Sequence, residues 1–238
     1  MTRGTVLQDV ILLPGLLCDE RLWAPQRKGL AGSAVPRTPD LTTCASIAAM
    51  AEGVLDQAPD RFALAGFSMG GCVALEVVAR APKRVCRLAL LSTSPWGVAP
   101  SVRQHYLDSI GGIETGGLGA YLTNAFPLYV APQRAHDQAL WDIFASMAKS
   151  LGPTVAVRQM RSLLEYPGFR RDLGQIACPT AIICGREDRR TPCAVHEELT
   201  GRIPKARLRV IEHAGHFTPL EEPQAVTDAL REWLLAPI

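Results

Sequence analysis

The chain of 238 residues is 47% hydrophobic and 20% charged, a globular composition with enough length for one large domain and its core. Its 25 basic and 23 acidic residues leave a net charge of +2 without a basic patch, which argues against a nucleic-acid-binding protein. No apolar run approaches the roughly 18 residues that a membrane-spanning helix requires, so we expect no membrane span.

Residues 1–96 alternate between apolar runs and segments with helical periodicity. We expect strands over residues 6–13, 34–37, 62–65 and 85–91. We expect helices over residues 19–30, 43–55 and 72–79, the second of them capped by Thr43 or Ser46. Pro36 cannot donate a ladder hydrogen bond, which favours an edge position for its strand. Strands and helices that alternate with short connections predict a parallel sheet covered on both faces.

The alternation stops after Ser94-Pro95-Trp96. From residue 97 to about residue 173 we expect no strand, but helical segments near residues 101–110, 118–124, 133–151 and 154–166. They are separated by breaks at Gly111-Gly112, Gly116-Gly117, Pro127, Pro132 and Gly152-Pro153. The alternation returns with strands over 180–184 and 206–211 and helices over 193–199 and 223–235. Residues 97–173 are therefore predicted to be a helical insertion in an α/β domain.

A G-x-S-x-G motif, Gly66-Phe67-Ser68-Met69-Gly70, lies between a predicted buried strand and a predicted buried helix. A serine on such a sharp turn is held in strained backbone geometry, with its hydroxyl exposed above the sheet edge. The flanking positions must be small because the helix comes close to the strand there. This context predicts that Ser68 is a nucleophile rather than a serine in an ordinary glycine-rich loop.

A nucleophilic serine needs a base, and the base needs an orienting acid. Asp188 follows the predicted strand 180–184, and His216 follows the last predicted strand. Catalytic side chains of open parallel sheets collect at the carboxyl ends of the strands, so we expect these three residues to meet. The order Ser68, Asp188, His216 is the one expected for a nucleophile elbow.

Four motifs give the chain a specific resemblance: LLPGLL (12–17), GFSMGG (66–71), GREDRRTP (185–192) and HAGHFTPLEEP (213–223). Together they resemble the α/β-hydrolase superfamily, in its small lidded esterase and acyl-hydrolase branch. The resemblance implies an α/β-hydrolase core over residues 1–96 and 174–238 and a helical cap, or lid, over 97–173. It also implies an oxyanion hole formed by the backbone N–H groups of Met69 and Leu16. The usual His-Gly of this loop is Pro14-Gly15 here, so the loop lacks a side-chain hydrogen bond from that position.

The resemblance implies a serine hydrolase that cleaves an ester or thioester of a small to medium, mainly apolar acid, without a cofactor or metal. Two alternatives stay open. The same triad could cleave a C–C bond, open a lactone or act in a lyase step. Relatives that catalyse those reactions tend to carry polar groups in the cap for a carboxylate substrate. The insertion offers four arginines for this purpose: Arg103, Arg134, Arg158 and Arg161. Alternatively, the chain could be a non-catalytic ligand-binding relative.

Other polar residues near these motifs have simpler interpretations. The resemblance favours Asp188 over Glu187 as the acid, and Glu187 is expected to be solvated. His213 and His216 lie three apart, but no third ligand is evident and a metal site is not expected. His213 is expected to be structural and Cys18 a passive thiol. The remaining histidines, which fall in predicted helices, are expected at the surface: His105, His136 and His196.

Aromatic and aliphatic residues of the insertion are candidates for an apolar acyl pocket over Ser68. They are Tyr106, Phe126, Tyr129, Trp141, Phe144 and Met147. Some of them are equally expected to form the core of the helical cap. The expected partner is a small-molecule acyl substrate, and the sequence does not distinguish a monomer from a homodimer. Seven irregularly spaced cysteines, an odd number, favour a reducing cytoplasm over a disulfide framework.

Overall fold

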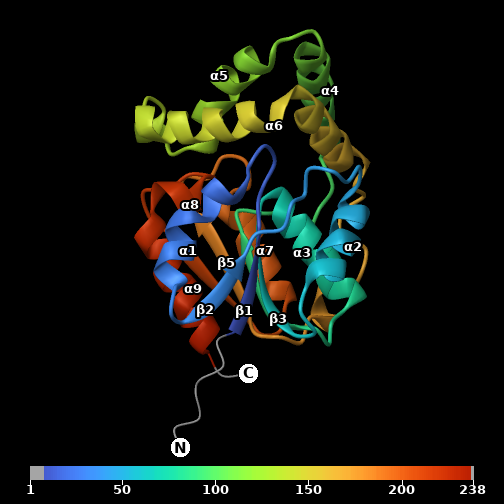
Figure 1. Cartoon of the computed structure of the whole chain (residues 1–238), viewed down its shortest axis with the longest axis vertical. Helices are drawn as coiled ribbons and strands as arrows, with labels where there is room; N and C mark the ends of the chain where they lie inside the picture. Colours follow the sequence, from blue (N-terminus) through green and yellow to red (C-terminus); the bar gives the residue numbers. More distant parts are fainter. Residues whose placement is uncertain (1–7, 237–238) are drawn as a thin grey trace, which may run out of the picture.

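The computed structural model describes residues 8–236, and its centre is a parallel sheet (Figure 1). In this part of the chain the sheet has six strands in the order β2-β1-β3-β4-β5-β6. They are β1 (Gln8–Leu13), β2 (Ala34–Arg37), β3 (Phe62–Phe67), β4 (Val85–Leu91), β5 (Thr180–Gly185) and β6 (Ala206–Ile211). Each of the five strand pairings is parallel, as predicted. The strand containing Pro36 lies at an edge, and Val6 and Leu7 of the first predicted strand lie outside the described residues.

Helices cover both faces of this sheet. The helices α1 (Ala24–Leu30) and α9 (Pro223–Leu235) pack together on one face, and α2 (Ile47–Gln57) and α3 (Met69–Arg80) pack together on the other (Figure 1). The remaining core helices are the short η1 (Glu20–Trp23), α7 (Cys193–Arg202) and α8 (Thr218–Glu221). Ser46 caps α2 by accepting a hydrogen bond from the Ala49 N–H at 3.1 Å. The helix predicted over 19–30 is divided into η1 and α1, although Leu22, Trp23 and Leu30 are buried as expected.

Residues between β4 and β5 form a separate helical layer above the carboxyl edge of the sheet (Figure 1). We call residues 97–173 the helical segment. It contains α4 (Pro100–Glu114), α5 (Leu118–Tyr129), η2 (Pro132–Arg134) and α6 (Gln138–Glu165), and it ends at the first residue of η3 (Leu173–Gln175). None of the helices within residues 8–236 is both long and apolar enough to cross a membrane.

Three predicted boundaries within the helical segment are wrong. Gly111 and Gly112 lie inside α4, and Pro127 lies inside the last turn of α5. Near a helix end these residues cost helical stability without ending the helix, because few backbone hydrogen bonds follow them. The helix predicted from Gln133 begins at Gln138, where Asp137 supplies the cap. The break at Gly152-Pro153 is present as a kink in α6, where Gly152 has φ 80°.

The entry and exit of the helical segment are joined to each other. Trp96 pairs with Gly168 in an isolated antiparallel bridge, and the Phe169 N–H donates to the Pro95 carbonyl at 2.7 Å. Gly168 has φ 83°, a left-handed conformation that favours glycine. The segment therefore leaves and re-enters the sheet at nearly the same place.

Two glycines provide a matched test of this packing. A Cβ on Gly70 would lie 2.4 Å from the Leu13 carbonyl oxygen, whereas a Cβ on Gly111 would meet nothing within 4 Å. We expect Gly70→Ala to lower the free energy of unfolding by about 1–3 kcal/mol, because backbone atoms must move apart. Gly111→Ala should raise it by about 0.5–1 kcal/mol through helix propensity. Urea unfolding measures both, and a Gly70→Ala protein as stable as wild type would contradict the packing argument.

Candidate active site

Ser68 occupies the turn between β3 and α3 in strained backbone geometry, with φ 52° and ψ −116°. Backbone and side-chain hydrogen bonds hold this turn. The Ser68 N–H donates to the Leu91 carbonyl at 2.9 Å, and the Ser68 carbonyl accepts from the Thr93 hydroxyl at 2.7 Å and from the Gly71 N–H at 2.8 Å. A residue remains in such a conformation only where its surroundings hold it there, and such positions cluster at functional sites. Ser68 is half-buried, whereas the residues on either side of it are buried.

The three predicted catalytic side chains come together at the carboxyl ends of their strands. His216 Nε2 lies 2.9 Å from Ser68 Oγ, and His216 Nδ1 lies 2.9 Å from Asp188 Oδ2. Because an ionised carboxylate can only accept hydrogen bonds, Nδ1 carries the proton and Nε2 is left to accept from the serine hydroxyl. Both His216 and Asp188 are buried. The arrangement can therefore transfer the Ser68 proton to His216.

Asp188 is held in its ionised form by several donors. Its Oδ1 accepts from the N–H groups of Arg190 at 2.8 Å and Thr191 at 2.9 Å, and its Oδ2 accepts from the Thr191 hydroxyl at 2.8 Å. Burial alone raises the pKa of this carboxyl group, but the charge and hydrogen bond of His216 and the Thr191 donors outweigh burial and lower it to about 2. Sequence reasoning missed Thr191, although its place three residues after an acid in a loop is a known pattern for such hydrogen bonds.

The loop that carries Leu16 lies directly against the serine. A Cβ on Gly15 would lie 2.8 Å from the Phe67 ring and 3.3 Å from the Ser68 Cβ, so a side chain here would force neighbouring groups to move. Leu17 has φ 56°, and its N–H donates to Gln159 Oε1 at 2.9 Å. Gln159 comes from α6 and is buried. Its side chain thus supplies a hydrogen bond to a loop in which Pro14 replaces the usual histidine, and no local pattern in the sequence pointed to it.

Glu221 connects the His216 loop to the helical segment. Its Oε1 accepts from the Gly215 N–H at 2.9 Å, and its Oε2 accepts from the Ala131 N–H at 2.7 Å. Burial raises the pKa of Glu221 to about 7, although both N–H groups lower it. A further backbone hydrogen bond joins the Phe217 N–H to the Tyr129 carbonyl at 2.8 Å. The contact between Glu221 and Ala131 spans many residues of sequence, so no local pattern predicts it.

Four of the six predicted pocket residues are buried in the helical segment, and Trp141 is half-buried. The Tyr129 ring lies 5.5 Å from the His216 ring and stacks on Phe217 at 5.1 Å. Phe144 also contacts Phe217, at 5.4 Å between ring centroids. Phe126 packs against Trp141 and Phe144, and Met147 is buried. The sixth residue, Tyr106, lies on α4 beside Arg190.

Three of the remaining sequence expectations agree with the structure, and one is wrong. Glu187 is half-exposed and accepts from Gln133 Nε2 at 3.0 Å, outside the triad. His105 and His136 are exposed. His196 was expected at the surface but is fully buried, where its Nε2 accepts from the Thr93 N–H at 3.1 Å. Helix α7 packs this ring under the end of β4, so the histidine satisfies a backbone donor beside the Ser68 turn.

His213 and Cys18 do not contribute chemistry in this geometry. His213 is exposed at φ 61° in a turn. Cys18 is buried, and burial raises the pKa of its thiol far above the ordinary value, as expected for a passive thiol. Residues 8–236 contain no group of three or more His, Cys, Asp or Glu side chains arranged to hold a metal ion.

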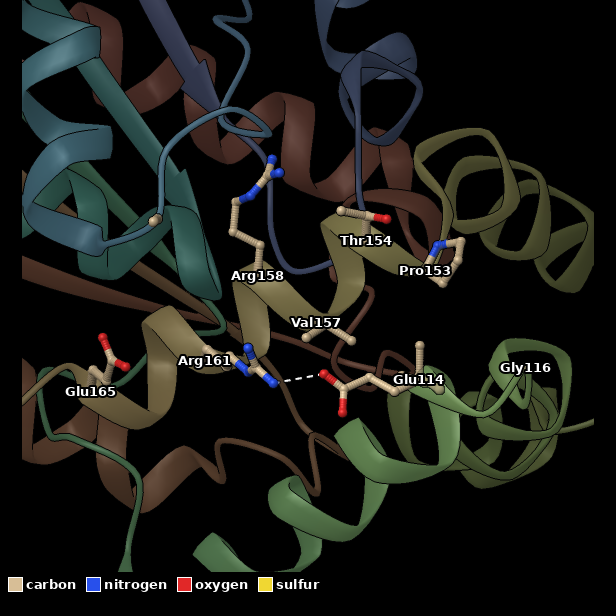
Figure 2. Close-up of a pocket in the computed structure, with 10 residues that line it drawn as sticks. Glu114, Gly116, Pro153, Thr154, Val157, Arg158, Arg161 and Glu165 are labelled. Atoms are coloured by element: carbon tan, nitrogen blue, oxygen red, sulfur yellow. Dashed lines mark hydrogen bonds and ion pairs between the residues drawn. The ribbon is translucent and has the colours of Figure 1, made fainter.

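Two cavities are lined mainly by residues of the helical segment. The larger has a volume of about 660 Å³ and lies between the end of α4, the second half of α6 and Ala45 (Figure 2). Arg161 forms an ion pair with Glu114 there at 2.6 Å, and Arg158 donates to the Thr42 carbonyl. The smaller cavity, of about 300 Å³, lies between α4 and α5 and is lined in part by Arg190. Ser68 lines neither cavity.

A parallel sheet with a serine turn after a central strand, and with helices inserted above its carboxyl edge, defines the α/β-hydrolase class. The chain matches the model of the Alpha/beta hydrolase family over residues 8–229 and therefore belongs to that family. It is an enzyme of the carboxylesterase-like type.

Individual relatives agree with this family assignment. The chain is 27% identical over 234 residues to the pimeloyl-[acyl-carrier protein] methyl ester esterase of Nitrosomonas europaea, with 91% of each chain covered. It is similar in structure to a thermophilic esterase from Thermogutta terrifontis, with a TM-score of 0.86, 25% identity and coverage of 97% of this chain and 90% of that one. It shares the fold of an enol-lactonase from Burkholderia xenovorans LB400, with a TM-score of 0.87, 20% identity and coverage of 98% and 94%.

Glu221 makes the stability of the protein depend on pH. Its folded-state pKa of about 7 lies above the ordinary 4.5, so between these values the folded state binds the proton more tightly than the unfolded chain. The contribution of Glu221 is therefore complete below pH 4.5 and lost as the pH rises through 7. We expect the wild-type free energy of unfolding, relative to that of Glu221→Gln, to fall by on the order of 3 kcal/mol between about pH 4.5 and pH 8.

Urea unfolding across this range measures the difference between the two proteins. Glu222→Gln is the matched control, because Glu222 is only half-buried and pairs with Arg134. A wild-type and Glu221→Gln difference that does not vary with pH would show that Glu221 titrates normally.

Proposed function

We propose that the chain is a serine hydrolase that cleaves an ester or thioester of a small to medium, mainly apolar acid. The observation that carries this proposal is the continuous hydrogen-bond path from Ser68 Oγ through His216 to Asp188. Geometry of this kind activates a serine, because the base accepts its proton while the acid holds the base in the required tautomer.

In the proposed first step, Ser68 Oγ attacks the carbonyl carbon and His216 Nε2 accepts the hydroxyl proton. Asp188 stabilises the resulting imidazolium, which suits a carboxyl group whose pKa is lowered to about 2. The N–H groups of Met69 and Leu16 would stabilise the oxyanion. Their positions support this role, since Met69 is the first residue of α3 and Gly15 brings its loop against Ser68.

In the following steps His216 returns the proton to the leaving group, which departs and leaves an acyl group on Ser68. Water, deprotonated by His216, then attacks the acyl-enzyme and releases the acid. These steps use only water and groups of this chain. All seven cysteines are free, which supports the proposal that the protein acts in the reducing cytoplasm.

We further propose that residues 97–173 form a cap that selects the acyl group. The aromatic side chains of the helical segment support this idea, because Tyr129 and Phe144 extend an apolar surface from the His216 loop into α5 and α6. Phe126, Trp141 and Met147 continue this surface. A relative named as a methyl ester esterase agrees with cleavage of an ester.

A fluorophosphonate probe and a panel of substrates test the proposed reaction. We expect the wild-type protein to be labelled at Ser68 and Ser68→Ala to lose turnover by on the order of a million-fold while remaining folded. The panel consists of 4-nitrophenyl esters of increasing acyl length, an acyl thioester, a lactone and a vinylogous diketone. A Ser68→Ala protein that keeps a tenth of wild-type activity would contradict the nucleophile assignment, and wild-type turnover of the diketone alone would contradict ester hydrolysis.

Gln159 provides a second test, directed at the oxyanion loop. Gln159→Leu removes the acceptor of the Leu17 N–H and leaves a buried donor without a partner. We expect kcat for a 4-nitrophenyl ester to fall about tenfold or more while KM changes little, because loss of a positioned oxyanion donor affects the transition state. Gln159→Glu retains an acceptor and should retain more of the activity. A rise in KM alone would place Gln159 in substrate binding instead.

A further inference from the structure

Arg190 is a half-buried cation beside the candidate active site that the proposed mechanism does not use. It follows Asp188 by two residues, and its side chain extends toward the helical segment. Its Nη2 donates to the Tyr106 hydroxyl at 3.2 Å, and its guanidinium carbon lies 5.0 Å from the centre of the Tyr129 ring. Because Tyr129 also contacts the His216 ring, the Arg190 guanidinium and the proposed catalytic base both lie against one aromatic ring.

The charge of Arg190 has no ion-pair partner among residues 8–236. Asp188, the nearest acid in sequence, is already bound by His216 and Thr191. The neighbouring tyrosines do not neutralise the charge either. Burial raises the pKa of Tyr106 to about 12 and that of Tyr121 well above its ordinary value, so both remain neutral. A cation that is partly withdrawn from water and has no counter-ion is more stable when a ligand supplies the negative charge.

The other arginines considered for a carboxylate substrate are occupied by the protein. Arg134 pairs with Asp137 and Glu222, and Arg161 pairs with Glu114 (Figure 2). Arg103 donates to the Leu164 carbonyl and Arg158 to the Thr42 carbonyl. The larger cavity therefore offers cations that are already bound, whereas the smaller one offers Arg190.

The smaller cavity has room for a short aliphatic chain that ends in a polar group. Its volume of about 300 Å³ lies at the lower end of the range for ligand pockets. Apolar and polar walls are both present, the former from Ile113, Ala125 and Leu128 and the latter from Tyr121 and Asn124. Asp108 also lines it, exposed and bound by Gln104, and would disfavour a doubly charged phosphate more than a singly charged carboxylate. A planar guanidinium suits a carboxylate, which it can bind through two parallel hydrogen bonds.

We propose that Arg190 and the cavity between α4 and α5 form a carboxylate subsite, and that the substrate is an ester bearing a free carboxylate a few methylene groups from the carbonyl that Ser68 attacks. This inference rests on the proposed ester hydrolysis. The carboxylate belongs either to the acyl group or to the alcohol, and the chemistry of recognition is the same in both cases.

Two substrate pairs test the subsite and distinguish these sources. The acyl pair is the 4-nitrophenyl monoester of adipic acid and 4-nitrophenyl hexanoate. The alcohol pair is the acetate ester of 6-hydroxyhexanoic acid and hexyl acetate. We expect wild-type kcat/KM to favour the charged member of one pair. Arg190→Gln should reduce that preference about tenfold to a hundredfold, the range for loss of a charge-assisted hydrogen bond.

Two further variants control this measurement. Arg190→Lys keeps the charge without the planar fork and should keep part of the preference. Arg189→Gln changes the exposed neighbouring arginine and should leave the preference unchanged. If Arg190→Gln does not fold, the wild-type pairs and Arg190→Lys still decide the question. Wild-type protein without a preference in either pair, or Arg190→Gln with the wild-type preference, would overturn the subsite.

Calorimetric titration with adipate separates this inference from the proposed function, because adipate contains no ester. Wild-type protein should bind adipate more tightly than Arg190→Gln does, by about tenfold to a hundredfold. Binding through Arg190 without hydrolysis of any ester would retain the subsite and overturn the proposed reaction. Hydrolysis of neutral esters with no preference and no adipate binding would retain the reaction and overturn the subsite.

Discussion

The close approach of α3 to the ends of β1 and β3 is the constraint on which the site depends. A Cβ on Gly66 would lie 2.3 Å from the Gly70 carbonyl oxygen, and one on Gly70 would meet the Leu13 carbonyl. Only backbone without side chains allows this packing, and the packing in turn holds Ser68 at φ 52°. The same contact brings the loop of Pro14 and Gly15 against the serine. The geometry of Ser68, the proposed nucleophile, and that of the neighbouring loop thus have one common cause.

The helical segment contributes to the candidate site as well as covering it. Gln159 of α6 binds the loop of Leu17, and Glu221 joins the His216 loop to the segment through the Ala131 N–H. Phe217 adds ring contacts with Tyr129 and Phe144. Because these contacts are buried, water competes little for their hydrogen-bonding groups. The side chains involved therefore have few alternative partners. Movement of the helical segment would therefore change the environment of both His216 and the candidate oxyanion loop.

Three ionisable side chains at the candidate site differ in how the protein compensates their charge. Asp188 receives hydrogen bonds from both its own loop and His216, which keep it ionised. Glu221 receives only two backbone hydrogen bonds, so burial dominates and its pKa rises to about 7. Arg190 has aromatic rings and a tyrosine hydroxyl around it but no carboxylate. The protein itself supplies the partners of Asp188 and Glu221. For Arg190, a bound ligand could supply the counter-charge.

The sequence by itself determined the parallel sheet, the turn that carries Ser68 and the strand ends that carry Asp188 and His216. Each of these depends on local patterns: apolar runs, glycine spacing and position after a strand. The catalytic roles of these residues remain predictions, although the fold brings their side chains within hydrogen-bonding distance. Only the tertiary structure decided the positions of Gln159, Glu221 and the buried His196. These side chains accept from backbone N–H groups of loops: Leu17, Ala131, Gly215 and Thr93. Such a donor needs a side-chain acceptor only once the chain has packed, and a linear sequence carries no local signal for that need.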